Sequence, residues 1–199
     1  MRKLIVCNIM SLDGYYEGPD HNVMVLPMGG PFDAYNAERL RSADTLLLGR
    51  VSYEMFRGFW PSVADDPDPQ WSPDNREISR LNNAIAKIVI SDTLTSEQTA
   101  PWHNSTRIIK RADAHHQITD LKRQTGGDIL MFGSHLLWND LLAHDLVDEL
   151  HIMIGNVVIG DGTPLFERAL AASLGLIGIR KWDGSDNALV RYEVRHKSV

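Results

Sequence analysis

The order in which apolar and helical segments alternate is the feature that most restricts the fold of this chain. Between residues 3 and 143, short apolar segments that stop at glycine or polar residues alternate with segments of helical pattern. Strands joined through helices pair in parallel, because a parallel connection needs a long crossover. After Val147 the pattern changes to strands joined by short turns. The sequence therefore predicts an α/β fold with a mainly parallel sheet, closed by an antiparallel C-terminal hairpin.

The expected elements can be placed by residue number. The expected strands are apolar or β-branched and lie at 3–10, 45–48, 86–91, 106–110, 129–132, 149–159, 178–182 and 189–195. The expected helices lie at 31–41, 52–59, 77–84, 118–124 and 136–143. Residues 15–30 form a long irregular loop, of the kind that serves as a lid or a binding loop. No repeat, low-complexity tract or linker interrupts this order, so we expect one domain over residues 1–199.

Composition and charge exclude several classes of function. The net charge is −6 at pH 7, and an acidic surface repels phosphate backbones, so we expect no nucleic-acid partner. Cys7 is the one cysteine, so no intramolecular disulfide can form, which is typical of a reducing compartment. Cys7 lies in an apolar strand pattern, where burial is expected. The apolar run before Asn8 is too short for a signal peptide or a membrane span, and we expect a cytoplasmic protein.

Gly49-Arg50 stands between an expected strand and an expected helix that starts near Ser52. The start of a helix presents unpaired N–H groups and a partial positive charge. A glycine lets a ligand approach the backbone, and an arginine can bind phosphate with two hydrogen bonds. Ser52 can cap the helix or donate to a phosphate. The segment therefore predicts either an anion site or an ordinary strand-to-helix corner with a surface arginine.

Two other strand ends carry polar residues. Gly133-Ser134-His135 follows the strand at 129–132 and precedes a helix, which is a second potential anion site. Ser91-Asp92 follows the strand at 86–91. In open α/β sheets ligands collect outside the carboxyl ends of the strands. The three strand ends together therefore favour one binding edge, although none matches the GxGxxG fingerprint of dinucleotide-binding folds.

These segments carry a resemblance to a known family. Ser11-Leu12-Asp13-Gly14 and Leu48-Gly49-Arg50-Val51-Ser52-Tyr53-Glu54 resemble the opening of dihydrofolate reductase, and Ser91-Asp92-Thr93-Leu94 and Phe132-Gly133-Ser134 resemble its later elements. Two C-terminal blocks are similar to the reductase domain of bacterial bifunctional riboflavin-biosynthesis deaminase/reductases and their uncharacterised relatives: Leu146-Val147-Asp148-Glu149-Leu150 and Val158-Ile159-Gly160-Asp161-Gly162-Thr163-Pro164-Leu165-Phe166. The resemblance runs along essentially the whole chain.

The resemblance implies a dihydrofolate reductase-like three-layer α/β fold, with NADPH lying across the strand ends. By motif match, Gly49, Arg50 and Ser52 would hold phosphates of the dinucleotide, and Arg50 would also contact the 2′-phosphate. Ser91 and Asp92 would lie near the adenosine half, and Gly133 and Ser134 at the pyrophosphate. The family often has a glycine where this chain has His135, and a side chain there could narrow the cofactor cleft.

Reduction of an imine-like bond needs hydride from the cofactor and a proton from a positioned acid. In dihydrofolate reductases an acidic residue near the start of the first helix holds the pterin, and Asp33 stands at about that offset from Gly49. Asp33 is therefore our candidate catalytic residue. The alternative is that Asp33 only complements the dipole of the first helix turn. Asp13 has a similar alternative, because Asp is a natural turn residue in Ser-Leu-Asp-Gly.

The histidines and tryptophans could in principle form a metal site or line a pocket. No spacing of Cys, His or Glu resembles a zinc site, so the histidines are expected at the surface or in the core, with no metal. The missing Cys/His signature also argues against the deaminase activity that some riboflavin enzymes carry in the same chain. Trp60 and Trp71 flank the acidic, proline-rich segment at 65–70, and they are the two tryptophans expected to line a substrate pocket.

Two functions remain open from the sequence. The first is an NADPH-dependent reductase that transfers hydride to a small pterin- or aminopyrimidine-like heterocycle; the lack of a basic cluster at 15–30 argues against a ribose phosphate. The second is a non-catalytic nucleotide- or ligand-binding protein that keeps the fold, because no proton donor is fixed and because of His135. The apolar run at 149–159 exceeds what one domain needs, and the related reductases pair through such strands. We therefore expect a homodimer.

Overall fold

The computed structural model describes residues 1–170 and 172–195, which form two compact units. The first unit comprises residues 1–4 and 33–134, and the second comprises residues 5–32 and the described part of 135–199. The fold is α/β, with mostly parallel strands and antiparallel strands towards the C-terminus, as the sequence predicts. Among the described residues, no helix combines the length and the apolar composition that crossing a membrane requires.

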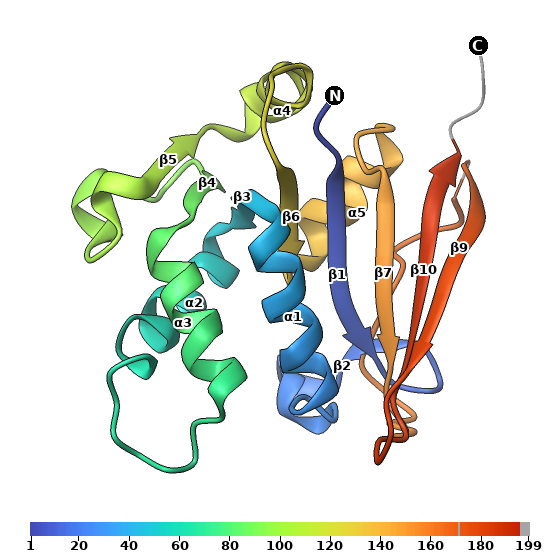
Figure 1. Ribbon diagram of the computed structural model, residues 1–199. Coiled ribbons are helices and arrows are strands. Elements are labelled where there is room, and N and C mark those ends of the chain that lie inside the picture. The colour runs from blue at the N-terminus through green and yellow to red at the C-terminus, as the bar shows by residue number, and fades with distance from the viewer. Residues whose placement is uncertain (171, 196–199) are drawn as a thin grey trace. The chain divides into compact units, whose positions relative to one another are not determined.

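The first unit is built on four parallel strands in the order β5-β4-β3-β6 (Figure 1). Their bounds are β3 Ala43–Gly49, β4 Ala86–Ile90, β5 Thr106–Ile109 and β6 Asp128–Phe132. Leu46, Leu47 and Leu48 of β3 are wholly buried, as expected for a parallel strand with both faces covered. Because all four strands run the same way, their carboxyl ends lie at one edge of the sheet.

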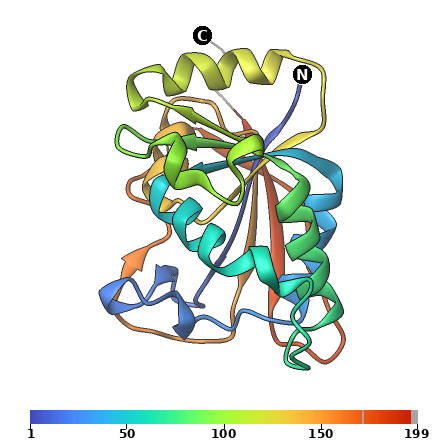
Figure 2. The same ribbon diagram turned by 90° about the vertical axis from the view of Figure 1, so that its left-hand side faces the viewer.

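Four helices belong to this unit: α1 Pro31–Ser42, which starts two residues before the unit does, α2 Arg50–Val63, α3 Pro73–Ala84 and α4 Ala114–Arg123. Figure 2 shows α1 and α3 side by side, and a bidentate ion pair joins Arg41 to Glu77 between them. Ser72 and Asn75 form a reciprocal capping box that starts α3. The cap explains why α3 begins at Pro73, before the predicted 77.

The second unit holds the strand order β1-β7-β10-β9, in which β1 and β7 are parallel and the others antiparallel. The elements are β1 Leu4–Met10, α5 His135–Ala143, β7 Glu149–Ile154, β9 Ser173–Lys181 and β10 Ala188–Arg195. A separate two-stranded ladder pairs β2 Tyr15–Glu17 with β8 Thr163–Pro164. The predicted hairpin over 178–195 is confirmed, whereas the β2 strand inside the predicted loop was missed.

The predicted strand over 149–159 is wrong beyond Ile154. The N–H of Gly155 donates to the carbonyl of Met10 at 2.8 Å, and a Cβ on Gly155 would lie 2.6 Å from Cγ of Pro27. This close approach ends the strand. The strand β7 is also paired on both sides, with β1 and with β10. Its apolar residues are therefore core residues, and they do not form the free surface from which a homodimer was expected.

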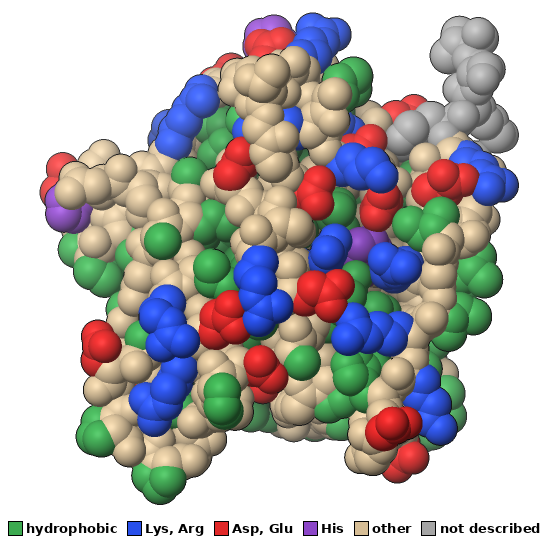
Figure 3. Space-filling view, viewed as in Figure 1, with side chains coloured by type: hydrophobic (Ala, Val, Ile, Leu, Met, Phe, Trp, Pro, Cys, Tyr) green, Lys and Arg blue, Asp and Glu red, His purple; other side chains and the backbone are tan. Residues whose placement is uncertain are grey.

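Exposed apolar side chains lie instead on β9, the last strand of its sheet. Leu176, Ile177 and Ile179 are 53%, 40% and 67% exposed. Figure 3 shows hydrophobic side chains along the right-hand edge of the molecule, where β9 lies in Figure 1. An edge strand with an apolar row is open to pairing with another chain. The homodimer stays a prediction, now assigned to β9.

Lys87 is a buried cation in the first unit. Its side chain is among the largest that are fully buried, and its Nζ donates to the carbonyl of Ile85 at 2.8 Å and to Oγ of Ser105 at 3.3 Å. The ammonium also lies 4.3 Å from the centroid of the Trp102 ring. Within the described part of the chain it pairs with no carboxylate, and burial lowers the pKa of Lys87 to about 8.

We predict that Lys87→Met changes the pH dependence of stability. The pKa of Lys87 is lower in the folded protein than in the unfolded chain, so wild-type stability rises with pH between about 8 and the unfolded value of 10.5. Relative to Lys87→Met, the wild-type protein should gain about 1–2 kcal/mol between pH 7 and pH 10, after a discount for solvent screening. Urea unfolding at both pH values measures the gain, with exposed Lys181→Met as control. Parallel pH profiles for wild type and Lys87→Met would contradict it.

We predict a homodimer that depends on the apolar row of β9. Sedimentation of the wild-type chain should give twice 22.4 kDa, and the double variant Ile177→Lys, Ile179→Lys should sediment as a monomer with unchanged folding. A charged side chain cannot be desolvated in an interface without a partner. A wild-type protein that is monomeric at working concentration would rule the homodimer out.

Candidate functional site

Two strand-to-helix corners of the first unit are joined by a reciprocal pair of hydrogen bonds. The N–H of Gly49, at the end of β3, donates to Oγ of Ser134 at 2.9 Å. The N–H of Ser134, beyond the end of β6, donates to Oγ of Ser52 at 2.8 Å. The structure thus brings Gly49 and Ser52 of one predicted corner together with Ser134 of the other. Each hydroxyl accepts one bond and keeps its own proton to donate.

The fold does not require a glycine at position 49. Its φ of −79° and ψ of 163° are ordinary extended values that any residue adopts. A Cβ placed on it would meet Oγ of Ser134 at 3.7 Å, which is normal van der Waals contact. Gly49 caps α2 without a side-chain hydrogen bond, so the first N–H groups of that helix are not capped by it. This corner therefore exposes backbone donors to a ligand that needs a close approach.

The β6 corner is conformationally strained. Gly133 and Ser134 have φ values of 61° and 55°, and Ser134 thus adopts a left-handed conformation that costs a non-glycine residue free energy. The two hydrogen bonds to Gly49 and Ser52 hold it there. Strain of this kind clusters at ligand sites, and here it turns the Ser134 hydroxyl and N–H towards the Gly49 corner.

Arg50 lies in the first turn of α2, with its side chain 46% exposed. Its Nη1 contacts both carboxylate oxygens of Glu54, one turn later, at 3.1 and 3.3 Å. An exposed pair at this spacing contributes only a few tenths of a kcal/mol, about 0.3–0.5. The guanidinium can therefore exchange Glu54 for a more strongly charged anion.

Ser91 and Asp92 stand at the end of β4, and they differ in availability. Oγ of Ser91 is buried and accepts hydrogen bonds from the N–H groups of Thr93 and Leu94, which gives it a turn-forming role. Asp92 is half-exposed, and its carboxylate faces Arg111 at 3.7 Å. Lys110 donates to the carbonyl of Asp92 at 2.8 Å.

Lys110 and Arg111 were not among the predicted site residues. They directly follow β5, whose carboxyl end lies beside that of β4, so the topology places two cations at the same edge as Gly49 and Asp92. The signal in the sequence was a basic pair at the end of an expected strand. This basic pair indicates an anion site only once β5 is known to lie beside β4.

Asp33 lies in the first turn of α1, and its carboxylate accepts a hydrogen bond from Nδ2 of Asn75 at 2.9 Å. Burial raises the pKa of Asp33, the hydrogen bond from Asn75 opposes that shift, and the charge of Asp74 adds to it. Asn75 is itself fixed by the capping box of α3. The acid is thus held at the junction of α1 and α3, in a position that favours its protonated form.

A continuous series of aromatic rings runs through the same unit, and we call it the aromatic path. Its successive ring centroids are 6.3, 6.5, 4.8 and 5.4 Å apart, in the order Phe132, Phe56, Trp60, Phe59, Trp71. Trp60 and Trp71 were predicted to line a pocket. The three phenylalanines were missed, although Phe56, Phe59 and Trp60 share a helical spacing that could have revealed them.

In the second unit Asp13 has a turn role. Its carboxylate accepts hydrogen bonds from the N–H groups of Ile159 and Gly160, at 3.1 and 2.8 Å. A hydrogen bond from Ser11 lowers the pKa of Asp13 most, desolvation opposes that shift, and the two backbone bonds lower the pKa further. Of the two alternatives left by the sequence, the contacts favour the structural one.

His135 is committed to contacts inside the second unit. Its Nε2 lies 2.8 Å from the carbonyl of Pro164 and 3.0 Å from that of Leu165, so Nε2 carries a proton. Its Nδ1 faces Glu167 at 3.2 Å, and the ring stacks on Tyr16 with centroids 4.9 Å apart. Burial raises the pKa of Tyr16. The imidazole therefore fastens the β2–β8 ladder to α5.

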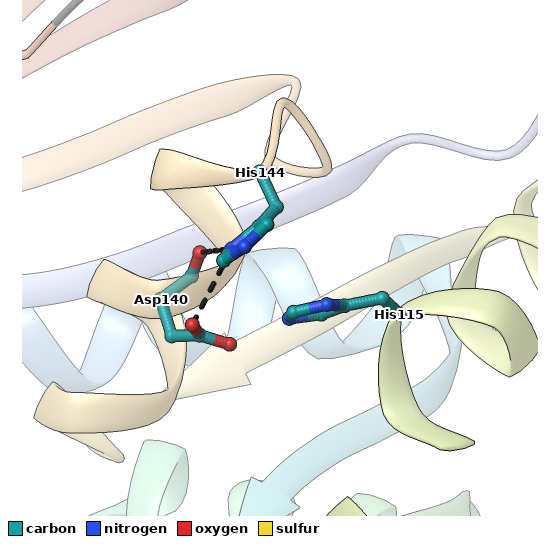
Figure 4. Close-up of side chains that lie close together, drawn as sticks. All are labelled: His115, Asp140 and His144. Atoms are coloured by element: carbon teal, nitrogen blue, oxygen red, sulfur yellow. Dashed lines mark hydrogen bonds and ion pairs between the residues drawn. The ribbon is translucent and has the colours of Figure 1, made fainter. Parts of the chain in front are cut away.

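Figure 4 shows the histidine at the end of α5. His144 turns back on Asp140, with its Nδ1 2.8 Å from the carbonyl and 3.3 Å from the carboxylate of that residue. A histidine in this position complements the carbonyl end of a helix. His115, which is drawn in the same view, belongs to α4 of the first unit.

Comparison with known proteins places these features in a family context. The model of the RibD C-terminal domain matches residues 2–185. An uncharacterised protein of Bacillus subtilis strain 168, YyaP, is 28% identical over 165 residues, which cover 83% of this chain and 80% of that protein.

Two solved structures share the fold. A putative riboflavin biosynthesis protein from Shewanella sp. PV-4 has a TM-score of 0.68 at 21% identity, over 98% of this chain and 99% of that one. Dihydrofolate reductase from Enterococcus faecalis, complexed with NADP(H) and RAB-propyl, has a TM-score of 0.59 at 13% identity, over 98% and 97% of the two chains. The predicted resemblance is confirmed.

We predict that Asp33→Asn does not weaken the fold at neutral pH. A carboxyl whose pKa is raised by folding lowers stability as the pH rises from its unfolded pKa of 3.8 through its folded pKa, since its charged form is the disfavoured one. The amide has a similar shape and can still accept from Asn75. Urea unfolding at pH 4 and pH 8 should show a smaller loss of stability with pH for Asp33→Asn than for wild type. A variant less stable than wild type at pH 8 would show that the Asp33 charge serves the fold.

Proposed function

Since the chain belongs to the RibD C-terminal domain family, we propose that it is an NADPH-dependent reductase that transfers hydride to a small pterin- or aminopyrimidine-like heterocycle. The family and the fold support a reductase role. The choice of NADPH as cofactor is supported by the residues at the carboxyl edge of the first unit's sheet.

The observation that carries the proposal is Gly49. A side chain at this position would disturb nothing in the fold, yet the position holds glycine beside two hydroxyls and the start of α2. A ligand that packs directly against the backbone explains a glycine that the fold does not require. Backbone N–H groups and hydroxyls at a helix start suit a phosphate. This set of donors fits the pyrophosphate of a dinucleotide.

In this proposal Gly49, Ser52, Gly133 and Ser134 hold the pyrophosphate. Their shared network is fixed before the ligand arrives, so little ordering is needed on binding. Arg50 adds a cation at the same corner.

The adenosine half extends over the ends of β4 and β5, near Ser91 and Asp92. Adjacent strands are about 4.8 Å apart, so the β4 and β5 ends lie within the reach of one nucleotide from the Gly49 corner. Lys110 and Arg111 then share the 2′-phosphate with Arg50, because all three stand at this edge of the sheet.

NADPH supplies the hydride when it is bound. The chain supplies the positioned acid: Asp33 hydrogen-bonds the ring nitrogen next to the reduced carbon and holds the proton that the nitrogen takes. Its raised pKa keeps a larger protonated fraction near neutral pH than an exposed aspartate would have. Asn75 fixes the carboxylate for this contact.

We predict that Gly49→Ala weakens NADPH binding and spares the fold. The new methyl group has room against Ser134, so stability should change by less than about 0.5 kcal/mol. The same methyl group occupies the ligand side of the corner, and the dissociation constant should rise at least about tenfold. Calorimetric titration with NADPH measures the effect, and thermal unfolding monitors the fold.

Gly58→Ala is the matched control, because Gly58 lies inside α2 with open space around its Cα. It should stabilise the protein by about 0.5–1 kcal/mol and leave NADPH affinity unchanged. A wild-type chain that binds no NADPH at saturating concentration, or equal affinities for wild type and Gly49→Ala, would count against the proposed site.

We predict that Asp33→Asn abolishes most turnover without loss of NADPH binding. Positioned proton transfer contributes about 10²–10⁴-fold to rate, and an amide cannot provide it. A panel of pterins, pyrimidines and quinones, followed by NADPH consumption, identifies an accepted substrate for the assay. Turnover by Asp33→Asn at the wild-type rate would remove Asp33 from the mechanism.

A further inference from the structure

We propose that the substrate of this chain is a planar aromatic ring system, neutral or cationic and without a phosphate group, that stacks on the outer end of the aromatic path beside Asp33. The inference rests on the proposed function for the hydride that such a ring would accept. The binding surface is formed by side chains of the first unit.

The outer end of the path is formed by Phe59 and Trp71. Their rings meet edge to face at 5.4 Å, and Phe59 also meets Trp60 at 4.8 Å with an interplanar angle of 88°. Nε1 of Trp71 donates to Asp66 at 3.0 Å, which fixes the indole in place. Rings held at right angles to one another present both a face and an edge to a third aromatic group.

This end of the path is open to solvent. Phe59 is 46% exposed, and Met55 and Val51, one and two turns earlier on α2, are 51% and 73% exposed. The three side chains form an apolar stripe that begins just after Arg50 and leads to Trp71. Burying such a stripe would contribute about 25 cal/mol of favourable free energy for each Å² of apolar surface removed from water. Contiguous exposed apolar surface next to polar groups is typical of a ligand-binding surface.

The stripe is connected to the candidate acid through the capping box of α3. Trp71 directly precedes Ser72, the cap of α3, and Asn75 of the same capping box donates to the carboxylate of Asp33. The start of α3 thus links an aromatic surface to a half-buried carboxyl group. A planar ring with an amino or imine nitrogen at its edge can stack on the first and hydrogen-bond to the second.

The charges around this surface disfavour a phosphate. Four aspartates lie on the segment that carries Trp71 and on the start of α3: Asp65, Asp66, Asp68 and Asp74. Arg76 is the one cation between residues 64 and 76, and its guanidinium donates to the backbone carbonyls of Asp66 and Asp68. Arg57 on α2 likewise donates to the carbonyl of Ala100. A phosphate needs cations that are available, whereas an acidic surface attracts a cation.

Aromatic rings add to this preference. A cation over a tryptophan or phenylalanine face gains about 0.5–2 kcal/mol, and an anion gains nothing comparable. A basic heterocycle thus suits the rings, the aspartates and Asp33 together. In the reaction, the carbon of a neutral C=N bond would receive the hydride that NADPH supplies, and the π electron pair of that bond would pass to nitrogen. The nitrogen would take the proton from Asp33, which is left as a carboxylate.

Two probes test the inference in the absence of cofactor. One is 2,4-diaminoquinazoline, a planar base, and the other is 5-amino-6-(5-phosphoribosylamino)uracil, which carries a phosphate. Quenching of tryptophan fluorescence reports binding of each to the full chain. We expect the quinazoline to bind at least tenfold more tightly than the phosphorylated pyrimidine. Equal affinities, a preference for the phosphate, or no quinazoline binding would overturn the proposal.

Variants separate stacking from charge. Phe59→Ala should weaken quinazoline binding at least tenfold, whereas Ile179→Ala, which removes a more exposed apolar side chain from β9, should leave it unchanged. The pair Asp65→Asn, Asp68→Asn should weaken the quinazoline severalfold and tighten the phosphorylated probe. Thermal unfolding checks that each variant is folded, and Met55→Ala provides a second variant of the stripe. No effect of Phe59→Ala and Met55→Ala would place the ligand elsewhere.

These results are independent of the cofactor. If NADPH does not bind but the quinazoline does, the proposed reductase function fails while the aromatic site stands. If NADPH binds and the quinazoline does not, the cofactor site stands and the inferred substrate class is wrong.

Discussion

The reciprocal hydrogen bonds among Gly49, Ser134 and Ser52 are the constraint on which the candidate site depends. The β6 corner adopts two consecutive left-handed residues, and a serine would not hold that conformation without compensation. The bonds give this compensation and also aim two hydroxyls and the start of α2 at one place. Because both corners lie on parallel strands that are hydrogen-bonded to each other, the sheet sets their spacing and the serines set their orientation. A ligand would therefore meet donors that are already arranged.

Asp33 illustrates a different relation between fold and function. Burial and the neighbouring Asp74 both disfavour its charge, and one hydrogen bond from Asn75 is the opposing contact. A neutral residue would suit that environment at least as well. An acid kept where the fold gains little from it is more readily explained by chemistry than by stability. The same argument does not extend to Asp13, whose carboxylate satisfies two backbone N–H groups of a neighbouring turn.

The sequence predicts those features that are local or that follow from parallel topology. Gly49, Ser91 and Gly133 could be placed at one edge because strand-helix alternation implies parallel strands, and parallel strands share their carboxyl edge. The reciprocal serine bonds could not be predicted, since they join residues more than eighty positions apart. The end of β7 at Ile154 was missed for a similar reason: the approach of Pro27 to Gly155 is a tertiary contact without a local signal. Lys110 and Arg111 became site candidates only through the neighbourhood of β4 and β5.

Two glycines show how a requirement of packing can be distinguished from a requirement of ligand binding. Gly162 lies in the C-terminal block that carries the family resemblance, with a φ of 142°, and a Cβ there would stand 2.1 Å from the carbonyl oxygen of Glu17, so any side chain would break the β2–β8 ladder. Its glycine is explained by packing alone. Gly49 has an ordinary backbone and room for a methyl group, so packing leaves its glycine unexplained. When the folded chain does not require a glycine, and the position faces donors fixed by strained backbone, the remaining physical reason is something that must come close from outside. That contrast is what separates the Gly49 corner from an ordinary helix start.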